Sequence, residues 1–253
     1  MKRTFLILGI FISISTFAQR EEKIEYYTDS DVRNQIFSIG VRYDPYFTSR
    51  TLLTGSVLPS QEYYFLNSST TGRFGNAYGI DLFFRLNERL DLGVGFERST
   101  GGYTWDFIKI LQTTGTISDT VDGDFAVDVD VSYLSIPFRF NFSTQMNDLW
   151  ALEVAPVFEV NFLEKLNYDL RDSRNIFTPE QRDSIGFGDQ KENARQVNYT
   201  IGVEVGGRYF ITENLSLHMM GILRYMLQPL TENFGPRETL LRYGGSFGLR
   251  YRF

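Results

Sequence analysis

His218 is the only histidine of the chain, so any catalysis that needs an imidazole has to use it. Ser216 lies two positions earlier, and two residues at that spacing share one face of an extended strand. With a carboxylate such as Glu204 on a neighbouring strand, they would complete a Ser–His–acid set of the kind that activates serine for acyl transfer. The alternation described below directs all three side chains into a narrow interior. We therefore interpret His218 as a satisfied interior histidine and name no catalytic residue.

Metal binding finds few suitable ligands, because the chain has no cysteine and a single histidine. Calcium would use oxygen ligands, and aspartates are concentrated between residues 119 and 130. Their spacing matches no calcium-binding loop, and Asp124, Asp128 and Asp130 fit better on one solvated face of a hairpin. A formal charge of −6 also argues against nucleic acid, which needs a basic surface. We expect no metal, no cofactor and no nucleic-acid partner.

The C-terminal stretch 241–253 shows the kind of element that would position charged side chains. Phe253, Tyr251, Leu249 and Phe247 occupy alternate positions, and the positions between them carry arginine, glycine or serine. Side chains alternate along a strand, so one face of this segment is apolar and the other is polar. A transmembrane barrel needs this pattern on every strand, apolar toward lipid and polar toward the lumen.

Seven further segments repeat the alternation, which gives eight predicted strands: 35–44, 76–86, 90–97, 133–142, 150–161, 199–209, 215–225 and 241–253. Short polar turns alternate with longer links between these strands. The predicted turns are 87–89, 143–148 and 212–214, and the predicted loops are 45–74, 163–196 and 228–239. The link after Gly101 is predicted to form a hairpin that stands clear of the membrane. Pro137 has no amide donor, which predicts a local weakening of its ladder and indicates a bulge or an edge-like position. The predicted fold class is all-β, an eight-stranded antiparallel up-and-down transmembrane β-barrel with long extracellular loops.

The charged residues on the polar face are nearly balanced in sign and include no lysine. An eight-stranded barrel is only wide enough for side chains to fill, and planar arginine pairs carboxylates bidentately. We interpret the set as an ion-pair network that plugs the lumen; the alternative is the lining of an ion-selective pore. The principal members are Arg42, Asp81, Arg85, Glu97, Arg139, Glu153, Glu159, Glu204, Arg208, Arg224, Arg242 and Arg250, and Asp91 and Arg252 lie on the same face.

The apolar face carries aromatic residues close to the predicted strand ends. The amphipathic rings of tyrosine and tryptophan favour the headgroup region of a membrane. We therefore expect an aromatic girdle at Tyr43, Tyr78, Trp150, Tyr199, Tyr209, Tyr225 and Tyr243. Phe247, Leu249, Tyr251 and Phe253 end the chain as an apolar row that resembles the C-terminal assembly signal of bacterial outer-membrane barrels.

The first 18 residues have the form of a secretory signal peptide: Met-Lys-Arg, an apolar run and then Ala18. The apolar run is too short to cross a bilayer as a helix; a retained anchor is the alternative. We predict a signal peptide at 1–18, a short acidic periplasmic tail at 19–34 and a barrel at 35–253. Both mature termini would then lie in the periplasm.

With its aromatic last strand, the chain resembles the small outer-membrane barrels of the OmpA/OmpX type. The segment Tyr133-Leu-Ser-Ile-Pro-Phe138 and the signal end at Ala18-Gln19 are more similar to the Bacteroidota barrels grouped as PorT-like. The resemblance covers residues 35–253 and implies a Gram-negative outer membrane. Some members of that wider group serve in secretion or envelope assembly.

The function expected from these features is that of a non-enzymatic envelope barrel with a structural or interaction role. Its expected partners are outer-membrane lipids, the barrel-assembly machinery and proteins that contact the loops at 45–74 and 163–196. A narrow, porin-like channel for ions or small solutes is the first alternative, and an outer-membrane lipid-modifying enzyme is the second. At the level of the fold, the alternative is a soluble exported β-barrel.

Overall fold

The computed structural model describes residues 36–52, 70–106, 111–114, 117–120, 125–172, 188–231 and 237–253. By its internal contacts the chain divides into residues 1–34 and 35–253, and everything below concerns the second unit. The predicted signal peptide and tail lie outside the described residues.

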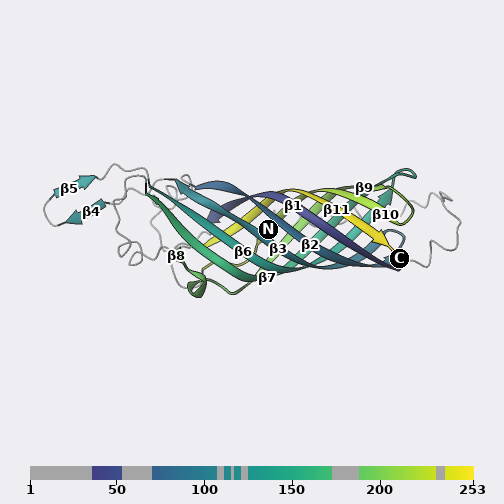
Figure 1. Cartoon of the computed structure of the whole chain (residues 1–253), viewed down its shortest axis with the longest axis horizontal. Helices are drawn as coiled ribbons and strands as arrows, with labels where there is room; N and C mark the ends of the chain where they lie inside the picture. The colour runs from purple at the N-terminus through teal and green to yellow at the C-terminus, as the bar shows by residue number, and fades with distance from the viewer. Residues whose placement is uncertain are drawn as a thin grey trace, which may run out of the picture. The chain divides into compact units, whose positions relative to one another are not determined.

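Eight long strands form one antiparallel sheet that closes on itself (Figure 1). Each strand pairs with its neighbours in the sequence, and the ring is completed by the pairing of β1 with β11. This is the predicted eight-stranded up-and-down topology. The strands are β1 (Phe37–Leu52), β2 (Thr70–Asn87), β3 (Leu90–Asp106), β6 (Phe125–Gln145), β7 (Trp150–Asp172), β9 (Val197–Phe210), β10 (Leu215–Met226) and β11 (Glu238–Arg252).

Three shorter strands accompany the ring. β4 (Leu111–Thr114) and β5 (Ile117–Thr120) pair with each other, and β8 (Gly188–Asp189) adds two residues to the edge of β7. A single 3-10 turn, Lys191–Asn193, follows β8. Within the described part of the chain, no helix is long and apolar enough to cross a membrane.

The three predicted tight turns connect β2 to β3, β6 to β7 and β9 to β10. Side chains in the turns fix them: the Asn147 carboxamide oxygen accepts the amide N–H of Trp150 at 2.9 Å, and the Thr212 hydroxyl accepts that of Leu215 at 3.0 Å. The barrel also begins and ends here, because the Phe253 amide donates to the Phe37 carbonyl. We call this the short-turn end and the opposite one the far end.

Toward the far end the strands are longer than predicted. β1 runs through Pro45 to Leu52, β2 starts at Thr70, and β7 continues to Asp172. The predicted loop bounds 45–74 and 163–196 were therefore wrong, and β11 begins at Glu238 inside the loop predicted at 228–239. The middle of the first loop, 53–69, lies outside the described residues.

The reason for these errors is an inversion of polarity along the strands. On β6, odd-numbered side chains point inward throughout: Arg139 near the short-turn end and Val129 near the far end are both buried. The outward positions change from exposed phenylalanines, such as Phe140, to aspartates, such as Asp130. Near the short-turn end the barrel is thus apolar outside and polar inside, whereas near the far end it is the reverse. The apolar exterior zone is called the belt below.

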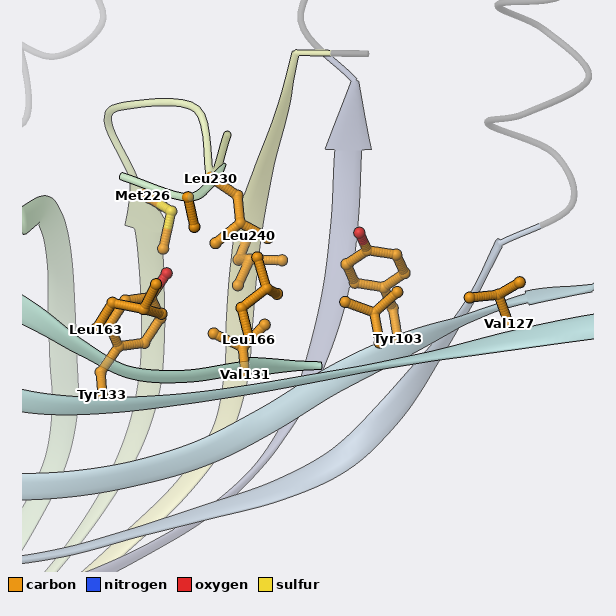
Figure 2. Close-up of a cluster of buried hydrophobic side chains, with 11 residues drawn as sticks. Tyr103, Val127, Val131, Tyr133, Leu163, Leu166, Met226, Leu230 and Leu240 are labelled. Atoms are coloured by element: carbon orange, nitrogen blue, oxygen red, sulfur yellow. The ribbon is translucent and has the colours of Figure 1, made fainter. Parts of the chain in front are cut away.

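The inverted region has its own hydrophobic core, which Figure 2 shows in close-up. Leu230, from the segment after β10, is fully buried in it, and its amide donates to the Glu238 carbonyl at 2.8 Å. That segment therefore covers the core from the far end. The core consists of Tyr103, Val127, Val129, Val131, Tyr133, Leu163, Leu166, Ala194, Met226, Leu230 and Leu240.

β-Bulges break the strict alternation that the sequence suggested: the β2–β3 ladder shifts register between Gly72 and Asn76 and between Arg85 and Asn87, and the β6–β7 ladder shifts on β7. Ser132 pairs with Lys165 and Tyr133 pairs with Leu163, so Glu164 is the extra residue on β7. Beyond it, even-numbered residues face inward, which brings Leu166 into the core. Opposite Pro137 the β3–β6 ladder lacks two pairs without a change of register. The ladder is therefore weakened there as predicted, but none of the register shifts in the described ladders falls at Pro137.

Candidate functional site: a lumen filled by ion pairs

The centre of the barrel is occupied by a network of four arginines and five carboxylates, which we call the central network: Arg42, Arg139, Arg224, Arg242, Asp44, Asp81, Glu97, Glu159 and Glu204. Arg224 is its hub. Its side chain is fully buried and lies 2.7–2.9 Å from carboxylates on β1, β3, β7 and β9, namely Asp44, Glu97, Glu159 and Glu204.

Arg139 binds the other side of the same network. Its guanidinium lies 2.5 Å from Asp81 and 3.2 Å from Glu97. Arg42 bridges Asp44 and Glu204, each at 3.0 Å. Because Arg42, Arg139 and Arg224 each pair with carboxylates on more than one strand, the network links strands across the lumen.

A second set, the lower network, lies nearer the short-turn end. Asp91 accepts from Arg250 at 2.7 Å and from Arg208 at 3.4 Å. Glu153 pairs with Arg208 and lies 2.7 Å from the His218 Nδ1 atom. All four charged groups of Asp91, Glu153, Arg208 and Arg250 are buried.

Glycines make room for these large side chains. A Cβ atom at Gly95 would lie 2.1 Å from the Asp81 carboxylate and 3.1 Å from the Arg139 guanidinium. At Gly93 a Cβ would meet the ring of Phe83 at 2.7 Å. The inward face of β3 therefore carries glycine at these positions, because the side chains opposite fill the space that a larger residue would need.

Between the two networks a cavity of about 40 Å³ remains, next to Arg42, Glu153, His218 and Met220. A space of this size holds one or a few water molecules.

The structure places eleven of the twelve principal interior residues within the two networks. Arg85 is the exception: it lies at the strand end and donates to the Asn87 carbonyl at 3.3 Å. Asp44 was not among the predicted members, although it contacts both Arg42 and Arg224. It was missed because the first strand was expected to stop there; the alternation through Tyr46, Thr48 and Arg50 was the available signal.

The Ser216–His218 pair exists, but its acid is not the one anticipated. His218 binds Glu153, and the Ser216 hydroxyl lies 3.4 Å from the His218 Nε2 atom. Glu204 belongs to the central network. Ser216 is buried, and Arg208 and Arg250 flank the set, so the geometry leaves no room for an acyl substrate.

At the far end a third cluster joins four strands, all of it in the polarity-inverted region beyond the belt. The Arg50 guanidinium lies 3.4 Å from Glu238 and stacks 5.0 Å from the centre of the Trp105 ring. The Tyr103 hydroxyl donates to Glu238 at 2.5 Å, and Tyr168 adds a longer hydrogen bond. Sequence reasoning missed this cluster because Arg50 and Glu238 fell in predicted loops.

Burial controls the ionisation of this cluster. Loss of water around the carboxyl raises the pKa of Glu238 above its usual value, although Arg50 and the two tyrosine hydroxyls oppose the shift. Burial, with the negative charge of Glu238 nearby, also raises the pKa of Tyr103 well above its usual value. Tyr103 therefore remains a hydrogen-bond donor at any physiological pH.

The predicted girdle and terminal residues all lie on the outer face. Trp150 packs against Tyr209 at 4.9 Å between ring centres, and Phe253 lies 5.1 Å from Tyr251 and 6.0 Å from Phe37. Of the aspartates considered for calcium, Asp130 pairs with Arg73 and Asp128 with Arg171 on the outside of the far end. Asp124 lies outside the described residues. The remaining outward positions of the two predicted sets are Tyr43, Tyr78, Tyr199, Tyr225, Tyr243, Phe247 and Leu249.

Comparison with known proteins gives structural likeness only. No family model and no curated protein matches the sequence. Among solved structures, Neisserial surface protein A shares 15% identity at a TM-score of 0.42, over 85% of this chain and 97% of that one. OprG of Pseudomonas aeruginosa shares 10% at 0.40, over 87% and 97%, and Ail of Yersinia pestis shares 11% at 0.39, over 86% and 99%. At these values the likeness carries no argument about function, and none of these structures supports the PorT-like subgroup.

Proposed function

We propose that the chain is an integral outer-membrane β-barrel whose lumen is closed and which serves the envelope as a structural or interaction component. The observation that carries the proposal is the distribution of polarity: an exposed apolar belt surrounds a lumen packed with ion pairs. In water such a belt would be an unusually large apolar surface, whereas in lipid it is required. A closed ring also leaves no strand edge with unpaired amides in hydrocarbon.

The filled lumen supports a non-conducting barrel over the channel alternative. An ion crossing it would have to displace Arg224 and Arg139, each held by several carboxylates. It would then meet the apolar core at the far end, where Leu230 covers the barrel. The enzyme alternative gains no support, because Ser216 and His218 face the same filled interior.

The interaction role rests on the far end, which extends the barrel beyond the belt as a rigid wall of strands. β6 and β7 pair with each other up to Phe125 and Asp172, and their outward residues there are charged, such as Asp130 and Arg171. In this proposal protein partners contact this end of the chain, including the segments predicted as loops at 45–74 and 163–196. Outer-membrane lipids contact the belt, and the barrel-assembly machinery recognises the last strand. The narrower PorT-like assignment rests only on the segment 133–138 and the signal end.

Two measurements test the proposal. The native protein should stay with the membrane fraction after carbonate or high-salt washes and leave it only with detergent; release without detergent would indicate a soluble barrel. Purified barrel in planar bilayers should then give no discrete conductance steps at physiological salt. Regular conductance steps from the purified wild-type barrel would instead support the channel.

A further inference from the structure

The short-turn mouth of the barrel contains more positive charge than its acids neutralise. Four inward arginines come together there: Arg85 on β2, Arg208 on β9, and Arg250 and Arg252 on β11. The buried carboxylates within reach are Asp91 and Glu153. Among the described interior residues the mouth therefore carries two positive charges in excess, apart from His218.

The two acids are committed to the deeper arginines. Asp91 pairs directly across the strands with Arg85 in the β2–β3 register, yet its carboxylate turns to Arg250 and Arg208. Glu153 is shared by Arg208 and His218. Arg85 donates to the Asn87 backbone carbonyl, and among the described residues Asp91 and Glu153 are near enough to attract Arg252 but form no ion pair with it.

The arginines of the mouth also leave hydrogen-bond donors without acceptors. The Arg208 Nε and Arg250 Nη1 atoms are buried and have no hydrogen-bond acceptor. Both side chains are more than nine-tenths buried. Unpaired buried donors on charged groups are costly. In addition, Arg85 and Arg208 each repel Arg252 more strongly than Asp91 or Glu153 attracts it. A negatively charged acceptor at the mouth would offset the repulsion among these arginines.

We propose that the short-turn mouth is an oxyanion-binding site for a phosphate group, with Arg85 and Arg252 as its direct ligands. Guanidinium forks bind phosphate bidentately, and two on neighbouring sides of one opening suit a tetrahedral dianion. Ser38 lies between them on β1, directly opposite Arg252 in the β1–β11 register. The phosphate comes either from solution or from the headgroup of a phospholipid at the rim; only the lipid source rests on the membrane placement proposed above.

The test compares three forms of the full barrel: wild type, Arg85→Gln/Arg252→Gln, and Arg89→Gln as a control. Arg89 lies in the exposed turn at the same end but outside the lumen. In detergent, inorganic phosphate is titrated at low salt and followed by calorimetry. We expect saturable binding by wild type and by the control, and at least roughly tenfold weaker binding by the double variant, because two charged hydrogen-bonding groups are lost.

A second arm uses nanodiscs of phosphatidylglycerol in phosphatidylcholine, with the 31P line of phosphatidylglycerol as the readout. Broadening of that line that depends on Arg85 and Arg252, without phosphate binding in detergent, identifies the lipid as the source. If the double variant does not fold, Arg252→Lys replaces it, with weaker binding expected because lysine lacks the fork. Equal binding by all folded forms in both arms, or no binding in either, overturns the proposal. Neither result bears on conductance or membrane extraction, so the two proposals fail separately.

Discussion

Arg224 shows how much of this molecule depends on single buried charges. Its guanidinium is surrounded by carboxylates from four strands. A buried ion network offsets the cost of desolvation only while every charge keeps its partners. Removing one hub should therefore cost more than the sum of its hydrogen bonds suggests.

Replacing Arg224 with Met should lower the free energy of unfolding by about 3–5 kcal/mol, because the carboxylates around it remain buried without their cation. Urea unfolding of the barrel in lipid vesicles measures this. Arg98→Met is the control, since Arg98 pairs with Glu164 on the exposed outer surface, where solvent screens the pair. Similar losses for the two variants would contradict the role of Arg224 as hub.

Glu238 should make the far end sensitive to pH. Its pKa is raised above the usual 4.5 in the folded protein, so the folded state favours the protonated acid. The stability of the far end should then be highest at low pH and fall as pH rises from the usual value through the raised one. Glu238→Gln should remove this dependence.

The measurement follows Trp105 fluorescence during thermal unfolding between pH 4 and 8, in a Trp150→Phe background so that one tryptophan reports. Wild type should melt at a lower temperature as the pH rises across the window, and Glu238→Gln should show a flatter profile. Parallel profiles would mean that burial does not control Glu238.

At the scale of elements, the far-end core is a hydrophobic cluster enclosed by the far ends of the barrel strands. Leu166 is fully buried there, whereas Leu223 is 48% exposed on the belt. Leu166→Ala should destabilise the far end by about 2–5 kcal/mol, because a cavity is left in a packed core. Limited proteolysis of the barrel in vesicles would show faster cleavage at the far end for Leu166→Ala than for Leu223→Ala. Equal cleavage would argue against an independent core.

The strands within the belt could be predicted from the sequence because one physical rule, apolar outward and polar inward, holds along each of them. The rule predicted Arg139, Glu204 and Arg224 as interior residues. It failed beyond the belt, where Val129 and Leu166 are inside and charged residues are outside. Single-strand alternation looks the same in both zones, so only pairing with a neighbour shows which face is inner.

The partners within the network could not be predicted for a related reason. The alternation along the strands predicted that His218 and Glu153 both face the lumen, but it did not predict that they contact each other. Which carboxylate reaches the imidazole depends on the strand register and tilt, and these placed Glu153 rather than Glu204 beside it. The acid of the Ser216–His218 pair was accordingly misassigned.

At the scale of the whole molecule, the ring is completed by its first and last strands. β1 pairs with β11 from Ser38 and Arg252 to Leu52 and Glu238, and the Phe253 amide adds a hydrogen bond to the Phe37 carbonyl at 3.1 Å. The Phe253 ring itself is 60% exposed, so its packing within the barrel is slight. An exposed aromatic at the closing strand suits recognition by an assembly factor better than stabilisation of the folded state.

This distinction can be measured with Phe253→Asn and Phe253→Tyr. In cells, Asn should remove most of the folded barrel from the outer-membrane fraction, whereas Tyr, which keeps the ring, should not. Refolded into pure lipid vesicles, both variants should unfold in urea close to wild type, because an exposed ring contributes little burial. If Asn weakens the barrel as strongly in vesicles as in cells, Phe253 acts by packing against Tyr251 and Phe37, and the last strand is a structural seam rather than a signal.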